Sequence, residues 1–265
     1  MTGQYKVIWI TGVSSGLGRE LAVNYAELGV SIIISGRNEA HLAETALCCK
    51  NKGAEILSLP FDMTIDTEIE GAVKLAIAWK GNIDLLILNA GIGQRAYVHD
   101  LSMDVADYIM KVNYRSLVYI TKLLLPRFLV QKTAHIAVIS SVNGLYGFPL
   151  RAVYSASKHA LIGFYESLAL EMASKGICVT IVCPGRFGSG FSTRALDAFG
   201  KPYELLDNTH KNLLSVEKTA LKVMSAIARK KYFCFFGGKE LILLYLKRLN
   251  SNLFFSFTKR LNPKS

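Results

Sequence analysis

The chain has 265 residues, and 51% of them are hydrophobic, which is enough for a sizeable buried core. Its net charge of +11 is placed unevenly: residues 229–265 hold nine Lys or Arg and one acidic residue, a net +8, which leaves +3 for the first 228 residues. A nucleic-acid-binding protein with a uniformly basic surface would not show this distribution, so we expect no nucleic acid partner.

Cysteine and histidine usage indicates a reduced, metal-free protein. The five cysteines are odd in number and form no Cys-x-x-Cys pair, which is typical of buried thiols in a cytoplasmic protein. The five histidines lack the spacing of metal ligands, so no metal site is expected. The apolar run in "MTGQYKVIWITG" is too short for a signal peptide, and no stretch reaches membrane-spanning length, so the expected location is the cytoplasm.

Apolar, β-branched runs alternate with amphipathic stretches along the chain. Strand-like runs are expected at 5–11, 30–35, 54–60, 83–91, 134–141 and 177–185, helical stretches at 18–29, 39–53, 104–130 and 154–175, and further helical and strand signals at 217–236. Strands that are hydrophobic throughout, separated by helix-length segments, predict a parallel sheet covered on both faces. The fold class is therefore α/β, one doubly wound domain with its ligands at the carboxyl ends of the strands.

A glycine-rich segment, "TGVSSGLG" at residues 11–18, follows the first expected strand directly and opens a helix. Glycines let the backbone turn sharply and approach a pyrophosphate, and the helix offers its amino-terminal N–H groups to the negative charge. The spacing Gly-x-x-x-Gly-x-Gly differs from the commoner dinucleotide fingerprint. The predicted cofactor-binding residues here are Thr11, Gly12, Ser14, Ser15, Gly16, Leu17 and Gly18.

The end of the second strand bears on the choice of cofactor. An acidic residue there would bind the ribose hydroxyls of NAD, whereas an arginine accommodates a 2′-phosphate. The strand runs into Gly36, Arg37 and Asn38, and Arg19 adds a second positive charge after the glycine loop. We therefore expect NADP(H) in preference to NAD(H), unless Arg37 is only a solvated loop charge.

The segment "YSASK" places Tyr154 and Lys158 four residues apart, on one face of a helix and roughly 5–6 Å apart at Cβ. A free phenol has a pKa near 10, so a shift to about 7 needs on the order of 4 kcal/mol of differential stabilisation, which a neighbouring ammonium helps to supply. Taken alone, a Tyr and a Lys at this spacing are more often a surface pair, so the rest of the sequence has to decide whether they are catalytic.

These segments resemble the classical short-chain dehydrogenase/reductase family over roughly residues 5–236. "TGVSSGLG", "LNAG" at 88–91, Asn113, "ISS" at 139–141, "YSASK" and "CPG" at 183–185 stand in the order and spacing of that family. The resemblance implies a single Rossmann domain at 1–236 with a seven-stranded parallel sheet. It also implies a homodimer or homotetramer built on the helices around 104–130 and 154–175.

The resemblance assigns roles to individual residues. Tyr154 would be the general acid, Lys158 would hold the nicotinamide ribose and depress the tyrosine's pKa, and Asn113 would anchor a water relay. Ser141 would bind the reacting carbonyl; its spacing of thirteen residues from Tyr154 selects it over Ser140, since neighbouring strand residues face opposite sides. The further cofactor-binding residues implied are Asp62, Asn89, Ala90, Gly91, Pro184, Gly185 and Ser189, besides Tyr154 and Lys158.

The sequence departs from the family after Gly185. Phe187 and Ser189 stand where the family usually has valine and threonine, and the lid expected at about 187–214 is apolar. A lipophilic ketone, aldehyde or alcohol suits such a lid better than a sugar, unless these side chains only pack on the core. The apolar lid residues are Phe191, Leu196, Phe199, Tyr203, Leu205 and Leu206.

The last segment, 237–265, is basic, aromatic and amphipathic, with a break near 250–252. It resembles the carboxyl-terminal extension of the reductase subgroup that includes the 11β-hydroxysteroid-dehydrogenase-like and member 7-like enzymes. It would either lie on an anionic membrane surface or pack as a helix on the domain or across a dimer.

The function expected is an NADP-dependent oxidoreductase that interconverts a hydrophobic ketone or aldehyde and its alcohol. A 3-oxoacyl-carrier-protein reductase or a ketosphingoid-type lipid reductase is the alternative within the enzyme class. The alternative outside it is an NADP-binding sensor or scaffold, which the intact set Asn113, Ser141, Tyr154 and Lys158 disfavours.

Overall fold

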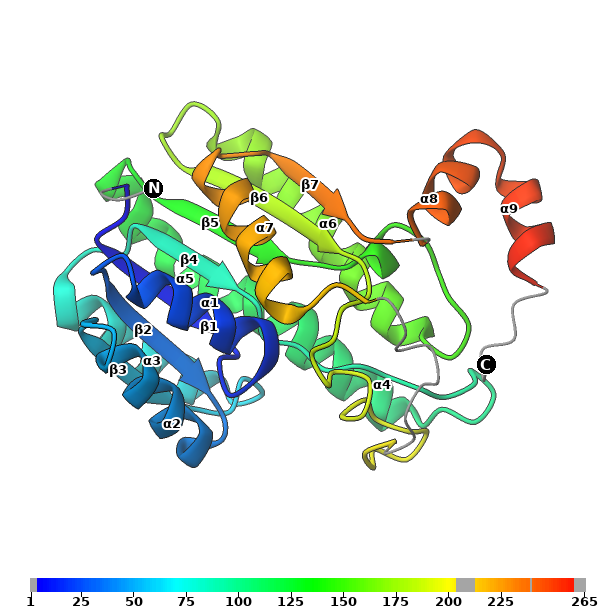
Figure 1. Ribbon diagram of the computed structural model, residues 1–265, viewed down its shortest axis with the longest axis horizontal. Helices are drawn as coiled ribbons and strands as arrows, with labels where there is room; N and C mark the ends of the chain where they lie inside the picture. Colours follow the sequence, from blue (N-terminus) through cyan, green and yellow to red (C-terminus); the bar gives the residue numbers. More distant parts are fainter. Residues whose placement is uncertain (1–3, 204–212, 239, 260–265) are drawn as a thin grey trace.

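A seven-stranded parallel sheet forms the centre of the computed structural model, which describes residues 4–203, 213–238 and 240–259 (Figure 1). The strand order is β3-β2-β1-β4-β5-β6-β7, and every neighbouring pair is parallel. The strands are β1 (Val7–Thr11), β2 (Ser31–Gly36), β3 (Ile56–Pro60), β4 (Leu85–Leu88), β5 (His135–Ile139), β6 (Cys178–Pro184) and β7 (Phe233–Phe236). The prediction of a doubly wound, seven-stranded sheet is confirmed.

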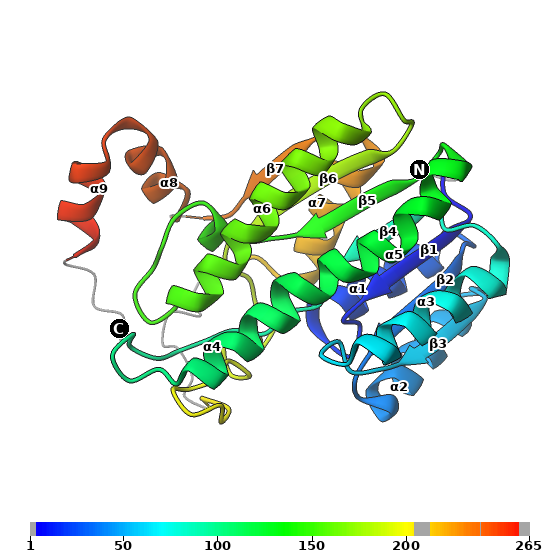
Figure 2. The same ribbon diagram turned by 180° about the vertical axis from the view of Figure 1, so that it is seen from behind.

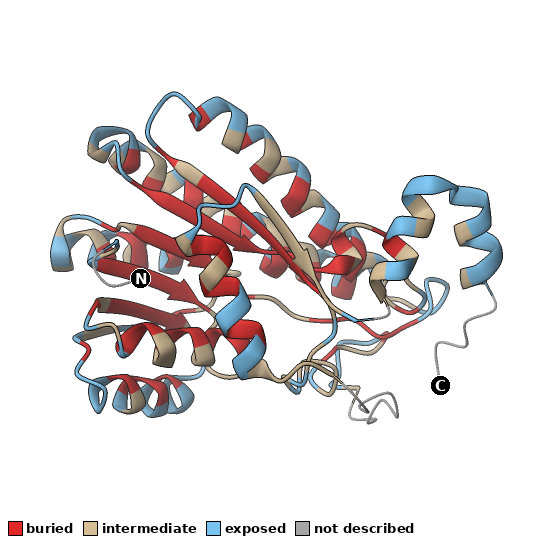
Figure 3. Ribbon diagram, turned by 45° about the horizontal axis from the view of Figure 1, so that its top comes forward, coloured by how far each residue is buried: buried red, intermediate tan, exposed pale blue. Residues whose placement is uncertain are grey.

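Helices cover both faces of the sheet. One face packs against α1 (Gly16–Ala26), α2 (Glu39–Lys50) and α7 (Val216–Ala228), which lie in front in Figure 1. The other packs against α3 (Asp66–Lys80), α5 (Ser116–Gln131) and α6 (Ala152–Met172), in front in Figure 2. Because both faces are covered, the central strands β1, β4 and β5 are buried at every position, as the red interior of Figure 3 shows.

The helical stretch expected at 104–130 has three parts: α4 (Met103–Met110), a π-helical turn, η1 (Lys111–Arg115), and α5. The π turn inserts an extra residue without ending the helix, a feature common at functional sites. A short 3₁₀ turn, η2 (Val142–Gly144), follows β5.

Two further helices follow β7, α8 (Glu240–Leu249) and α9 (Ser251–Thr258), and they project beside the sheet in Figures 1 and 2. They are separated at Asn250, whose side chain caps α9 by accepting from Leu253 N–H at 3.0 Å. The inner side of α8 packs on the domain, because Leu244 is 2% exposed and clusters with Val142 and Tyr146. The expected carboxyl-terminal helical extension is present, with its break at the predicted position.

The outer side of this extension is apolar and solvent-exposed, and includes Leu249, Leu253, Phe255 and Phe257. Within the described part of the chain, no helix is both long and apolar enough to cross a bilayer. The domain boundary predicted at residue 236 and the lid limits remain predictions, and the lid residues Leu205 and Leu206 lie outside the described residues.

Candidate active site

A glycine-rich turn joins the end of β1 to α1. Gly12 and Gly16 have φ values of +72° and +59°, which glycine adopts without steric penalty. A Cβ atom at Gly18 would lie 2.2 Å from the Gly12 carbonyl oxygen, so only glycine lets α1 begin this close to the turn. The first turn of α1 holds no acidic residue, and its N-cap, Ser15, makes no side-chain capping bond. The N-terminus of α1 therefore fits a bound pyrophosphate.

The segment after β4 is tied to the segment after β1. Asn89 Nδ2 donates to the carbonyl oxygens of Thr11 and Gly12 at 3.1 and 3.0 Å. Thr11 Oγ1 in turn accepts from the backbone N–H groups of Asn89 and Ala90. The sheet order reverses between β1 and β4, so these bonds hold together the crevice in which doubly wound folds bind ligands.

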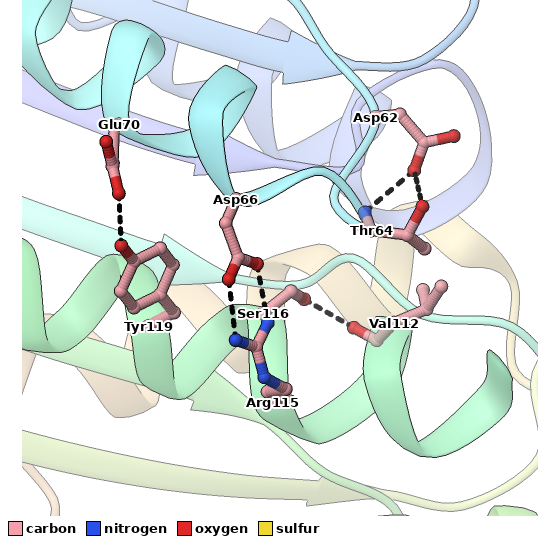
Figure 4. Close-up of polar contacts among 8 residues, drawn as sticks. All are labelled: Asp62, Thr64, Asp66, Glu70, Val112, Arg115, Ser116 and Tyr119. Carbon is pink, nitrogen blue, oxygen red and sulfur yellow. Dashed lines mark hydrogen bonds and ion pairs between the residues drawn. The ribbon is translucent and has the colours of Figure 1, made fainter. Parts of the chain in front are cut away.

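Arg37 and Asp62 follow β2 and β3. Arg37 is exposed, and its Nη1 donates to the Tyr108 hydroxyl on α4 at 2.9 Å. Asp62 Oδ1 accepts from the Thr64 N–H and hydroxyl at 2.7 and 2.8 Å, as Figure 4 shows. The Ser14 hydroxyl also reaches the end of β2: a Cβ atom at Gly36, the last residue of that strand, would lie 2.7 Å from Ser14 Oγ. Arg37 thus lies at this edge of the sheet, and its role in NADP binding stays a prediction.

Tyr154 and Lys158 are buried near the start of α6. Lys158 is 3% exposed, and its Nζ donates to the Ile139 carbonyl oxygen at 2.9 Å. The same Nζ lies 5.9 Å from the centroid of the Tyr154 ring. Burial lowers the pKa of Lys158 to about 8, so the side chain remains mainly protonated at pH 7.

The depression of the Tyr154 pKa by Lys158 stays a prediction for the cofactor-bound site, since the protein alone lacks the charge of the nicotinamide. Burial raises the pKa of Tyr154 above its ordinary value, and the hydrogen bond with Ser141 opposes that rise only in part. Lys158 does not counter the burial because its ammonium is directed to the Ile139 carbonyl. Tyr154 therefore keeps its proton at neutral pH in the protein alone.

The two serines after β5 face different partners. The Ser140 hydroxyl donates to the Lys158 carbonyl oxygen at 3.0 Å and so holds α6 against the sheet. Ser141 Oγ accepts from the Asn143 N–H at 3.2 Å and lies within hydrogen-bonding reach of Tyr154. The geometry thus places Ser141, and not Ser140, beside the phenol.

Asn113 sits in the π turn, fully buried. Its Oδ1 accepts from Ile92 N–H at 2.7 Å, and its Nδ2 donates to the Ile92 carbonyl and to Ser157 Oγ at 2.9 and 3.0 Å. A Cβ at Gly91 would lie 3.2 Å from Asn113 Oδ1 and 3.5 Å from Lys158 Nζ, so these two side chains flank Gly91. The side-chain amide fixes the segment after β4, and the relay role stays a prediction.

The π turn is itself fixed to α3. Arg115 makes a paired contact with the Asp66 carboxylate at 2.5 and 2.6 Å, and the Tyr119 hydroxyl donates to Glu70, as Figure 4 shows. The Ser116 hydroxyl donates back to the carbonyl oxygen of the second residue of the turn (Figure 4). The hydrogen bond from Arg115 holds the pKa of Asp66 below its usual range, so the carboxylate stays ionised.

The segment after β6 borders the glycine turn. Pro184 ends β6, and the Gly185 N–H donates across to β7 at 2.7 Å. A Cβ at Gly16 would lie 3.3 Å from Ser189 Cβ and 3.9 Å from Arg194 Nη2, which also donates to the Ser189 carbonyl at 3.2 Å. Ser189 and Arg194 therefore line the crevice opposite the N-terminus of α1. Arg194 gave no signal in the sequence.

The described part of the lid reaches the phenol. The Phe191 ring lies 5.7 Å from the Tyr154 ring, centroid to centroid. Leu196 pairs with the segment after β4, because its N–H donates to the Gly93 carbonyl and its carbonyl accepts from the Arg95 N–H. Phe199, in contrast, is 77% exposed, so the lid places only part of its apolar set at the site.

Gln94 is a site residue that sequence reasoning missed. It is fully buried, and its Oε1 accepts from the N–H groups of Val153 and Tyr154 at 2.9 and 3.3 Å. Its Nε2 donates to the Ala96 carbonyl at 3.2 Å. Gln94 therefore holds the first turn of the helix that carries Tyr154. Among residues 4–203, 213–238 and 240–259, no group of three or more His, Cys, Asp or Glu could hold a metal ion.

The sequence profile of the short chain dehydrogenase family matches residues 6–198. The chain belongs to this family. It is similar to dehydrogenase/reductase SDR family member 7B of Mus musculus, with 34% identity over 94% of this chain and 79% of that protein. It is also similar to family member 7 of Homo sapiens, with 38% identity over 72% of this chain and 58% of that protein. The predicted family and its member 7-like subgroup are therefore confirmed, and this short-chain dehydrogenase is an oxidoreductase.

Solved structures share the fold of this short-chain dehydrogenase. A short-chain dehydrogenase/reductase from Burkholderia phymatum in complex with NAD has a TM-score of 0.84, at 24% identity over 98% of both chains. A short-chain dehydrogenase from Streptomyces avermitilis has a TM-score of 0.81, at 25% identity over 96% of this chain and 98% of that one. The comparison with the Burkholderia phymatum protein covers nearly the whole of this chain, and so includes the helices after β7.

Proposed function

We propose that this protein is an NADP-dependent oxidoreductase that interconverts a hydrophobic ketone or aldehyde and its alcohol. The observation that carries the proposal is the buried group of Ser141, Tyr154 and Lys158, which lies at the carboxyl edge of the same sheet as the glycine-rich turn. A phenol, a hydroxyl and an ammonium suit the proton transfer and charge stabilisation that carbonyl reduction needs.

Tyr154 is the proton donor in the reducing direction. Burial keeps its phenol protonated at neutral pH, so it can give a proton to the carbonyl oxygen while the carbonyl carbon accepts a hydride. The Ser141 hydroxyl next to it orients that oxygen. The phenolate left after the transfer would be stabilised by the Lys158 ammonium, 5.9 Å from the ring centroid, when that ammonium turns from the Ile139 carbonyl toward the ring. In the oxidising direction the same groups act in reverse.

A nicotinamide cofactor, when bound, supplies or accepts the hydride. Its pyrophosphate would be held by the turn at Gly12–Gly18 and the N-terminus of α1, bordered by Ser189 and Arg194. NADP is favoured because Arg37, and no acidic side chain, directly follows β2. Arg19 supports this preference less, since its guanidinium is directed to Cys48 Sγ on α2 at 3.6 Å.

A lipophilic substrate is favoured by the apolar surroundings of the phenol. Phe191 borders the Tyr154 ring, and the fully buried Ala195 lies with Phe191 against Gly93. A charged or sugar-like substrate would have to bring polar groups against the Phe191 ring, which a lipophilic one would not.

The first experiment compares NADPH and NADH binding to the wild type, to Arg37→Ala and to Lys50→Ala, which removes an exposed charge at the end of α2. We expect a preference for NADPH that Arg37→Ala loses and Lys50→Ala keeps. A panel of lipophilic ketones with NADPH then tests turnover, and Tyr154→Phe should abolish it while still binding cofactor. Equal binding of both cofactors by the wild type would refute the NADP assignment. Binding without any turnover would favour a sensor.

We also propose a cytoplasmic protein that touches an anionic membrane surface through the outer side of α8 and α9. Support comes from the exposed Leu253, Phe255 and Phe257 of α9 and from the exposed cations Arg248 on α8 and Lys259 at the end of α9. Wild type should sediment with vesicles containing phosphatidylserine, and a Leu253→Ser, Phe255→Ser, Phe257→Ser variant should not. The proposal would be contradicted if the wild type did not sediment with these vesicles, or if the triple variant still sedimented with them.

A homodimer or homotetramer built on α4–α5 and α6 is the proposed assembly. Exposed apolar side chains on these helices, among them Leu129, Val130 and Leu170, support it. Light scattering of the purified protein measures the mass directly, and a monomer at micromolar concentration would contradict the proposal.

A further inference from the structure

The first residue of α8 reaches into the loop that follows β6. Glu240 Oε1 accepts from the Arg186 N–H at 2.9 Å. A Cβ at Gly185 would lie 1.9 Å from this oxygen, and a Cβ at Gly237 would lie 2.6 Å from it. The carboxylate therefore sits in a space that exists only because two glycines line it, directly over the backbone that continues from Pro184.

The same helix is bonded to the loop that follows Ser141. The Tyr146 hydroxyl donates to the Glu240 carbonyl oxygen at 3.2 Å, and Lys247 Nζ donates to the Leu145 carbonyl oxygen at 2.9 Å. Leu244 packs with Val142 and Tyr146 and is nearly inaccessible to solvent. Helix α8 thus joins two loops of the site that approach from different strands, one after β5 and one after β6.

We propose that Glu240 is a positioning residue, which fixes the loop after β6 against the cofactor and couples it, through α8, to the loop of Ser141. This inference rests on the proposed function, because it takes Gly185 and Ser189 to border the nicotinamide cofactor. A carboxylate accepting a backbone N–H is a stronger acceptor than a neutral amide oxygen, and this one joins the start of α8 to the segment between Gly185 and Ser189. The cost of removing it should therefore fall on cofactor binding.

The test uses full-length Glu240→Ala, Glu240→Gln and, as a matched control, Glu44→Gln, which changes an exposed carboxylate on α2. Hydrogen–deuterium exchange without cofactor reports the Arg186 amide directly. We expect it to lose protection in Glu240→Ala and to keep most of it in Glu240→Gln, whose amide oxygen still accepts. Glu44→Gln should match the wild type.

Cofactor titration and steady-state kinetics are the second readout. We expect Glu240→Ala to raise the cofactor Kd and KM about ten-fold, with kcat changed less, and Glu240→Gln to restore the Kd to within about three-fold of wild type. Unchanged exchange at Arg186 in Glu240→Ala would overturn the inference, as would an equal loss of kcat in both variants with cofactor binding unaltered. If the wild type bound no nicotinamide cofactor, the proposed function would fail, and the exchange result would still decide whether Glu240 holds the loop.

Discussion

Gln94 offers the most direct test of how the site is held together. Replacing it with Met keeps the volume of the side chain but removes the acceptor for two N–H groups in the first turn of α6 and the donor to Ala96. A helix cap contributes about 1–2 kcal/mol, and a buried polar group left without a partner costs about 1–3 kcal/mol. We therefore expect Gln94→Met to lower the free energy of unfolding by about 3 kcal/mol.

Urea unfolding followed by circular dichroism measures this loss, and Gln94→Glu is the matched control. This variant keeps the acceptor, and burial favours its protonated carboxyl, which can still donate to the Ala96 carbonyl, so it should lose less stability than Gln94→Met. Ketone reduction should fall in Gln94→Met, because Tyr154 lies in the affected turn. A Gln94→Met protein as stable as the wild type would show that the start of α6 is fixed by other contacts, and the reasoning would be refuted.

Three other predictions concern the turn, the sheet and the extension. Gly18→Ala should lower cofactor affinity by about 100-fold or more, since its Cβ would meet backbone at 2.2 Å, whereas Gly71→Ala, with open space around it, should bind normally in the same titration and gain about 0.5–1 kcal/mol of stability. Burial lowers the pKa of His135 from its ordinary 6.5 to about 4, so the unfolded chain binds the extra proton and stability should fall by about 3 kcal/mol between pH 6.5 and 4; urea titrations should show a flatter decline for His135→Gln. Leu244→Ala should cost about 2–4 kcal/mol and Leu249→Ala, at 85% exposure, under about 0.5 kcal/mol in thermal unfolding; equal effects would mean that α8 does not pack as described.

The sheet could be predicted because its signals are local. Each central strand is a short run of apolar, β-branched residues, and such runs separated by helix-length segments have few other solutions than a covered parallel sheet. The break between α8 and α9 was predictable for the same reason, since Asn250 interrupts the apolar periodicity and caps the next helix.

The supporting contacts of the site could not be predicted. Gln94 acts on residues about sixty positions away, and Glu240 on Arg186 more than fifty positions before it. Neither side chain belongs to a local pattern, because its partners are set by how the strands order in the sheet. The orientation of the Lys158 side chain could not be predicted for the same reason. Its spacing to Tyr154 places both residues on one face of α6, but the ammonium points to the carbonyl of Ile139, which lies on β5.

The π turn before α5 also determines which side chains of the long helix face the core. In an α-helix, four residues overshoot a full turn by about 40°, so side chains spaced by four drift steadily around the axis. Val105, Ile109, Asn113 and Leu117 are spaced by four and are all buried, which the wider turn at Lys111–Arg115 permits by cancelling part of that drift. Deleting Lys111 alone would restore regular α-helical winding and rotate one half of this long helix against the other, even though Asn113, Ser141, Tyr154 and Lys158 would all still be present.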